Sequence, residues 1–255
     1  VIALREGNDS EAENLIRRAV DIAPEKAAYH LDLGVALLNL NRPSEALVNC
    51  DDALRLNPDF AQAHNNRGAA LRALKEVERG LASIDHAIRL KPDYPEAYYN
   101  QGLALQEIGR IDEAKTSYDA AIRLRPDYAD ALNNRGLAHM ELARFADADS
   151  DFNAAIRAAP RDASAYWNKC FALLLQGRFE EGWPLLEWRW KLAGAHYPQH
   201  PAPVWTGRED LRGKAILVQA EQGLGDVIQF CRYASLLANL RSAEHTSELQ
   251  SRGLI

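Results

Sequence analysis

The amino-acid sequence predicts an all-α solenoid of stacked helix pairs, followed by the truncated start of a Rossmann-like βα unit. Proline recurs every 34 residues, at Pro24, Pro58, Pro92, Pro126 and Pro160. Glycine recurs at the same interval, at Gly34, Gly68, Gly102 and Gly136. A fixed period of this length indicates an array of like units, each burying its apolar face against its neighbours.

Each period predicts two helices. In the central one, small and apolar residues fall at helical spacing in two groups, Tyr98, Gly102 and Leu105, then Ala114, Tyr118, Ala121 and Ile122. Gly102 and Ala121 lack bulk, which predicts a close approach of the two helices. Pro126 cannot continue a helix, so we expect the second helix to end near it. Asp93 and Glu96 have capping-box spacing, which predicts a capped start for the helix that follows.

This pattern resembles the tetratricopeptide repeat over residues 1–196. The family's first helix carries an aromatic residue, Leu, Gly and Tyr, and the matching residues are His30, Leu33, Gly34 and Leu37. The resemblance implies a right-handed superhelix whose first helices line a concave groove. Later repeats depart from the family at the Leu position, which holds Arg67, Gln101, Arg135 and Lys169. We expect their stems to cover apolar surface while their polar ends reach water.

The repeat frame also predicts the domain organisation. We expect a partial repeat at 1–26, four full repeats at 27–162, an atypical capping repeat at 163–196 and a linker at 197–213. The capping repeat contains a tryptophan-rich stretch, 183–190, which we expect to be a docking seam rather than an aromatic ligand box. Residues 241–255 are polar and unpatterned and resemble a translated sequencing adapter. We therefore expect the sequence to be a fragment with a non-native tail.

Residues 214–240 predict the start of a second domain. An apolar run suited to a buried strand is followed by Gly223, Gly225 and Asp226, and then by a helical pattern. Glycines permit a tight turn, and the backbone N–H groups at the start of the helix can face an anion. A tight βα turn that binds no ligand is the alternative.

The stretch 207–237 resembles the start of the heptosyltransferase-like domain of GT-B glycosyltransferases, which follows tetratricopeptide arrays in many bacterial proteins. This resemblance implies that Asp226 is the general base on the acceptor hydroxyl. It also implies a sugar nucleotide as the donor of the full-length parent, bound mainly by a C-terminal half that is absent here. The chain as given is therefore expected to bind no cofactor and to be inactive.

A ladder of asparagines exceeds what helix packing needs. These residues stand two positions before the glycine position of the first helix, which Cys170 occupies in the last repeat, at Asn66, Asn100, Asn134 and Asn168. The ladder resembles that of the O-GlcNAc transferase repeats, which implies that the amides hold an extended protein or peptide segment in the concave groove. One position earlier, four residues would flank the same groove, Asn65, Tyr99, Asn133 and Trp167. The alternative is that the amides bridge adjacent helices within the array.

Composition argues against several other classes of protein. A net charge of −6 and a pI near 5.7 argue against a nucleic-acid partner. No apolar run approaches the length of a membrane span, so no membrane partner is expected. Cys50, Cys170 and Cys231 are far apart and form no C-x-x-C pair, and Cys50 and Cys170 stand at core positions of the repeats. This predicts buried thiols at Cys50 and Cys170 and suits a reducing, cytoplasmic compartment. No metal site is expected, because Pro198 interrupts the one close histidine pair.

The predicted function is that of a protein- or peptide-binding scaffold that recruits the acceptor for a glycosyltransferase. A stand-alone adaptor with no enzymatic role is the alternative, since the repeats alone are sufficient for binding.

Overall fold

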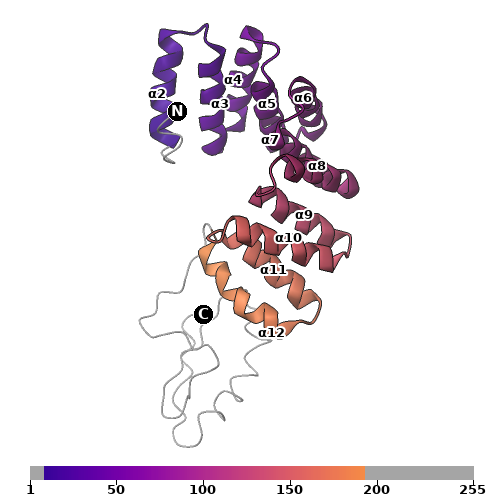
Figure 1. The fold of residues 1–255 in the computed structure, drawn as a ribbon. Helices are drawn as coiled ribbons and strands as arrows, with labels where there is room; N and C mark the ends of the chain where they lie inside the picture. The colour runs from indigo at the N-terminus through magenta and orange to yellow at the C-terminus, as the bar shows by residue number, and fades with distance from the viewer. Residues whose placement is uncertain (1–8, 193–255) are drawn as a thin grey trace, which may run out of the picture. The chain divides into compact units, whose positions relative to one another are not determined.

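The computed structural model of the chain describes residues 9–192, and this part consists of helices joined by short turns (Figure 1). The elements are α2 (Asp9–Ile22), α3 (Ala27–Asn39), α4 (Pro43–Leu56), α5 (Ala61–Ala73), α6 (Val77–Leu90), α7 (Pro95–Glu107), α8 (Ile111–Leu124), α9 (Ala129–Glu141), α10 (Phe145–Ala158), α11 (Ala163–Leu175), α12 (Phe179–Gly182) and the 3-10 helix η1 (Trp183–Lys191). The predicted all-helical solenoid is confirmed. The predicted linker, βα unit and tail (197–213, 214–240 and 241–255) lie outside the described residues.

The helices alternate between two rows. Each helix packs against the next one in the chain, and α3, α5, α7, α9 and α11 also pack against one another in that order. We call these five helices the first-helix row, and α2, α4, α6, α8 and α10 the second helices. Figure 1 shows the pairs following one another from indigo α2 to orange α12. The first-helix row is therefore a continuous surface that crosses every repeat junction.

Glycine permits the close crossing within the four pairs from α3 and α4 to α9 and α10, as the sequence predicts. A Cβ atom on Gly102 would lie 2.4 Å from the ring of Tyr118, and one on Gly136 would lie 2.6 Å from the ring of Phe152. Both rings are completely buried. The glycine thus makes room for the large side chain that the second helix places 16 residues later.

The turn inside each pair has one residue in the left-handed region. These residues are 34 apart and have φ between 56° and 75°, at Asn41, Lys75, Gly109, Ala143 and Gly177. The next N–H then bonds back to the last turn of the first helix, as from Arg110 N to Leu105 O at 2.9 Å. This is a Schellman end, which reverses the chain and starts the second helix.

Prolines end the second helices as predicted, but the capping prediction is wrong. Helix α8 ends at Leu124, two residues before Pro126. The N-cap of α7 is Tyr94 and makes no side-chain capping bond, because the helix begins with Pro95 and leaves Asp93 one residue too early. Asp162 does cap a helix, since its carboxylate accepts the N–H of Ser164 at 3.0 Å.

The last repeat differs from the others in its second helix. Helix α12 gives way to the 3-10 helix η1, whose second residue is Pro184. Proline has no N–H to donate and clashes with the preceding turn, which accounts for the change of helix type. Trp188 of η1 stacks on Tyr166 of α11, with ring centroids 3.6 Å apart. Trp183 remains 55% exposed, so the tryptophan-rich stretch packs only in part against the array.

Candidate binding surface

The asparagine ladder runs along the first-helix row and joins each repeat to the one before it. Asn100 Nδ2 donates to Asn65 Oδ1 at 2.9 Å. Asn168 Nδ2 donates to Asn133 Oδ1 at 3.0 Å, 35 residues earlier in both cases. At the junction between them, Asn134 Nδ2 donates to the Tyr99 hydroxyl at 3.3 Å. The bridging role, which the sequence left open as an alternative, is therefore present in the structure.

The same bonds decide which atoms the ladder offers to a ligand. Asn134 Nδ2 also donates to the backbone oxygen of Asp130 at 2.9 Å, so both of its hydrogens are used. Within the described part of the chain, no hydrogen bond reaches Oδ1 of Asn100, Asn134 or Asn168. These amides are only partly buried. The ladder thus presents three acceptors, while the array uses both amide hydrogens of Asn134 and one each of Asn100 and Asn168.

Asn66, the first rung, behaves differently from the other three. It makes no bridge to the preceding repeat, where the matching residue is Leu31, whose side chain cannot hydrogen-bond. Its Oδ1 instead accepts a bond from Asn65 Nδ2 at 3.3 Å. Removal of the Asn66 amide should therefore leave the repeat junctions unchanged.

The four flanking positions differ in how accessible they are. Asn65 and Asn133 are buried, with 3% and 8% of their surface exposed, and their amides hold the bridges just described. Tyr99 and Trp167 are partly exposed. The Tyr99 ring packs against Tyr128 with centroids 5.2 Å apart, and burial raises the pKa of Tyr99 to about 12. Only the two aromatic residues are therefore placed to touch a ligand.

The carboxylates on this row differ in whether they have a cationic partner. Glu96 is paired with Arg125, and Glu107 is paired with Lys75 at 2.7 Å. Asp32 and Asp130 make no ion pair with any described residue. Desolvation raises the pKa of both carboxyl groups, and the nearby Asp162 carboxylate raises that of Asp130 further. An unpaired, partly desolvated carboxylate favours a cationic or hydrogen-bond-donating neighbour.

The prediction for the four long polar residues at the family's Leu position is wrong. Their polar ends do not simply reach water but bind the second helix of the preceding repeat, 16 residues earlier. The four contacts are Arg67 to Asp51 at 2.6 Å, Gln101 to Asp85 at 2.8 Å, Arg135 to Asp119 at 2.7 Å and Lys169 to Asn153 at 2.7 Å. The signal was present in the sequence, because Asp or Asn recurs at that offset.

Arg135 has the most buried of these contacts. Its guanidinium also binds Asp151, which is 5% exposed, through Nε at 2.8 Å. The hydrogen bond to Asp151 is the main reason why the pKa of Arg135 is raised. Second helices on both sides of α9 are thus joined through one side chain.

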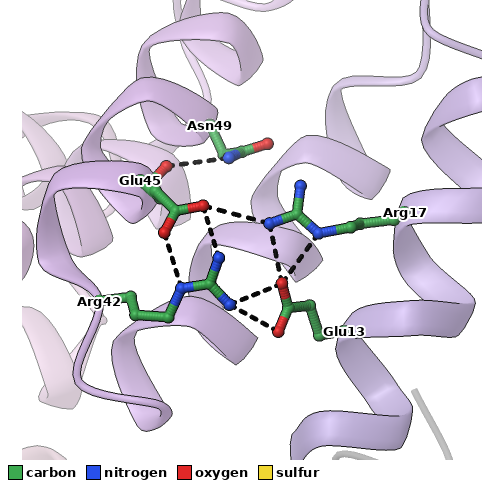
Figure 2. Close-up of polar contacts among 5 residues, drawn as sticks. All are labelled: Glu13, Arg17, Arg42, Glu45 and Asn49. Carbon is green, nitrogen blue, oxygen red and sulfur yellow. Dashed lines mark hydrogen bonds and ion pairs between the residues drawn. The ribbon is translucent and has the colours of Figure 1, made fainter.

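A ring of four charged residues joins the first two second helices (Figure 2). Arg17 Nε and Arg42 Nη1 each donate to Glu13 at 2.8 Å. Arg42 Nε and Arg17 Nη2 donate to Glu45 at 2.7 Å and 3.2 Å. Asn49 lies beside the ring and donates to the Glu45 backbone oxygen at 2.9 Å. Two cations and two anions leave this ring without net charge.

Other predicted features can be placed or lie outside the structure. Cys50 and Cys170 are free and completely buried, as predicted, whereas Cys231 lies outside the described residues. Gly223, Gly225 and Asp226, predicted to hold a phosphate and act as the general base, also lie outside them. Between residues 9 and 192, no helix is both long enough and apolar enough to cross a bilayer. The same residues include no group of three or more potential metal ligands.

Comparison with known families places the repeats. A family model described as tetratricopeptide repeat matches residues 2–49, 49–95 and 135–182, and a second of that description matches 84–116. A model described as TPR repeat matches 102–142. Protein FlbA of Caulobacter vibrioides is 45% identical over 60 residues, which is 23% of this chain and 10% of FlbA. The chain therefore matches only a small part of that protein's length.

Three solved structures illustrate the likeness in fold. TTC0263 of Thermus thermophilus has a TM-score of 0.63 and 22% identity, covering 68% of this chain and 95% of that one. PilF of Pseudomonas aeruginosa has a TM-score of 0.63 and 18% identity, with coverage of 76% and 88%. YrrB has a TM-score of 0.52 and 19% identity, with coverage of 72% and 95%. At these identities the likeness concerns the fold alone.

Proposed function

The chain belongs to the tetratricopeptide repeat family, and on that premise we propose that its first-helix row binds an extended segment of a partner protein. The observation that supports this proposal is the set of amide oxygens on Asn100, Asn134 and Asn168, which recur every 34 residues with no partner in the described chain. An extended peptide presents backbone N–H groups that can donate to such acceptors. YrrB is described as a TPR protein with an unusual peptide-binding site, which supports the same use of this fold.

The chemistry of the row favours a donor-rich and basic segment. Asp32 and Asp130 add two unpaired carboxylates to the three amide oxygens. A Lys or Arg side chain of the partner would replace the water that these carboxylates have lost. We therefore expect basic peptides to bind better than acidic ones.

The proposal is tested with short fluorescent peptides that differ only in whether Lys or Glu occupies alternate positions. Asn100, Asn134 and Asn168 are changed together, either to Ala, which removes the acceptors, or to Asp, which keeps an oxygen and loses the donor. We expect the Ala variant to bind the basic peptide at least about tenfold more weakly, since each lost bond removes about 0.5–1.5 kcal/mol. The Asp variant should keep its binding.

Circular dichroism on each variant separates lost binding from lost structure. Asn49→Ala on α4 is the matched control, because this asparagine lies on a second helix beside the charged ring. A folded Ala variant that binds the basic peptide as tightly as the wild type contradicts the proposal. Loss of binding in both variants, with both folded, would show that the amide donors rather than the oxygens hold the peptide.

A finer function rests on the sequence alone. The glycine-rich turn with Asp226 supports the proposal that this array recruits the acceptor for a sugar-nucleotide-dependent glycosyltransferase of the GT-B type, in a bacterial cytoplasm. In a protein that carries the natural continuation of the domain, Asp226→Asn should lower transfer by about 10²–10⁴-fold while donor binding persists. Near-normal turnover would assign Asp226 to the turn, and a continuation without a second Rossmann half would favour the stand-alone adaptor.

A further inference from the structure

A hollow of about 240 Å³ lies among helices α2, α3 and α4. It is bordered by Arg17 and Asp21 of α2, His30 and Leu33 of α3, and Asn49 and Asp52 of α4. The hollow belongs to the first full repeat, next to the charged ring of Figure 2. It lies away from the asparagine ladder and does not depend on the function proposed for it.

The hollow exists because the first full repeat has a short side chain where later repeats have a long one. Leu33 occupies the position of Arg67, Gln101, Arg135 and Lys169. Each of those side chains extends to the second helix of the preceding repeat and fills the space between the helices. Leu33 cannot reach so far, and the space beyond it stays open.

A second filler is missing at the same place. In two other repeats the aromatic residue of the first helix stacks on a ring 22 residues later. His64 stacks on His86 with centroids 4.2 Å apart, and Tyr166 stacks on Trp188. The matching partner of His30 is Asp52, which has no ring. A carboxylate therefore occupies the repeat position at which two counterparts of His30 have a ring partner, and both His30 and Asp52 border the hollow.

The charge at the border is also inverted relative to the other repeats. Asp21 stands where the later repeats have arginine, at Arg55, Arg89, Arg123 and Arg157. Its carboxylate makes no hydrogen bond or ion pair within residues 9–192. The nearby cation, Arg17, is already held by Glu13 and Glu45. In the described part of the chain, the one ion pair of Asp52 is with Arg55, at 3.3 Å, and the Arg55 side chain is 68% exposed.

His30 adds an unused polar group. Its ring is 7% exposed, and Nε2 lies 2.8 Å from the Pro24 oxygen, so Nε2 carries the proton and Nδ1 is left as an acceptor. Nδ1 is buried and has no partner in the described chain. Asn49 adds a further acceptor, since its Nδ2 is used by Glu45. The border of the hollow thus offers acceptors and negative charge on several sides, together with one aromatic face.

We infer that the hollow binds a planar cation of the guanidinium class, stacked on the His30 ring and hydrogen-bonded by Asp21 and Asp52. A guanidinium is flat enough to take the place that His86 and Trp188 take in their repeats, and it matches carboxylates in a fork geometry. Three of the four later repeats fill the same space with a cationic side chain of their own, Arg67, Arg135 and Lys169. The ligand is an arginine side chain of a partner protein or a small guanidinium compound.

The inference is tested by NMR titration of the whole chain with N-acetyl-arginine methylamide. We expect saturable shifts of the His30 ring signals with a dissociation constant on the order of 1 mM. The matched citrulline compound has nearly the same shape without the charge, and the lysine compound has the charge without the plane. If the citrulline compound binds as tightly as the arginine compound, the charge of the ligand plays no part and the inference is wrong. If the lysine compound binds as tightly as the arginine compound, the site does not require a planar cation and the inference is also wrong.

Variants locate the site. Asp21→Asn with Asp52→Asn should weaken binding at least about tenfold, whereas Asp93→Asn, an exposed control outside the hollow, should not. Leu33→Gln copies Gln101 and should fill the hollow, so it should abolish binding in a folded protein. Unchanged binding in either test overturns the inference. A capped Gly-Gly-Arg-Gly-Gly peptide that binds as well as the capped residue identifies a protein side chain as the source, and binding by free agmatine alone identifies a small molecule.

Discussion

Gly102→Ala tests whether the helix crossing sets the stability of the array. The new Cβ would lie 2.4, 2.6 and 2.8 Å from three ring atoms of Tyr118. Carbon atoms in contact lie about 3.5–4.0 Å apart, so the ring must move by about 1 Å. It has little freedom to move, since it is completely buried and its hydroxyl donates to Gln106 at 2.9 Å. Overpacking of this kind costs up to about 3 kcal/mol, and alanine returns about 1 kcal/mol through helix propensity.

The expected result is a loss of about 2 kcal/mol in the free energy of unfolding, measured by urea titration and far-UV circular dichroism. Gly34→Ala is the matched control at the same repeat position, because the nearest atom to its Cβ would be the Cys50 sulfur at 3.1 Å, followed by the Ala46 backbone oxygen at 3.5 Å. That variant should be within about 0.5 kcal/mol of the wild type. Tyr118→Leu in the Gly102→Ala background should restore part of the loss. A Gly102→Ala protein as stable as the wild type, or a pair of changes that are simply additive, would refute the crossing argument.

Three further predictions address the polar contacts. Asn100→Ala breaks a repeat junction and should cost about 1–2 kcal/mol in urea unfolding, whereas Asn66→Ala, which breaks none, should cost less than about 0.5 kcal/mol. Arg135→Met leaves a buried carboxylate without its cation and should lower the free energy of unfolding by about 3–5 kcal/mol. Arg67→Met, at a more exposed ion pair, should lower it by less than about 1 kcal/mol. Equal losses in the two variants would contradict the argument from burial. Burial lowers the pKa of His139 below its ordinary value, so its contribution to stability is complete above about pH 6.5 and is lost as the pH falls. Unfolding measured from pH 7 to pH 5 should therefore depend less on pH in His139→Gln, and an unchanged slope would exclude this residue.

Local constraints made most of the helix boundaries predictable. Pro126 and Gly102 act on the backbone around them, so their spacing identifies where helices end and where they approach. Asp93 was misjudged because Pro95 starts the helix one residue later than the capping spacing suggests. Pro184 indicates from the sequence that the second helix of the last repeat cannot continue as an α-helix.

Contacts between repeats were harder to predict, although their residues were visible. Arg67 and Asp51 both recur with the period of the array, yet nothing local shows that an offset of 16 residues brings them together. The asparagine ladder was found from sequence, but the atoms that remain free on Asn100 depend on the position of Asn65 in the neighbouring helix. The type of a side chain can be read from the sequence, whereas packing against neighbouring helices decides which of its atoms remain available to a ligand.

The amide bridges also couple occupancy of the ladder to its mechanics. A donor bound at Oδ1 of Asn100 polarises the amide and strengthens the bond that its Nδ2 donates to Asn65. Each ligand contact thus strengthens the hydrogen bond that joins that repeat to the one before it. In a chain whose units touch only their neighbours, the contributions of the separate joints add along the array. The occupied array would then resist bending and stretching more than the empty one.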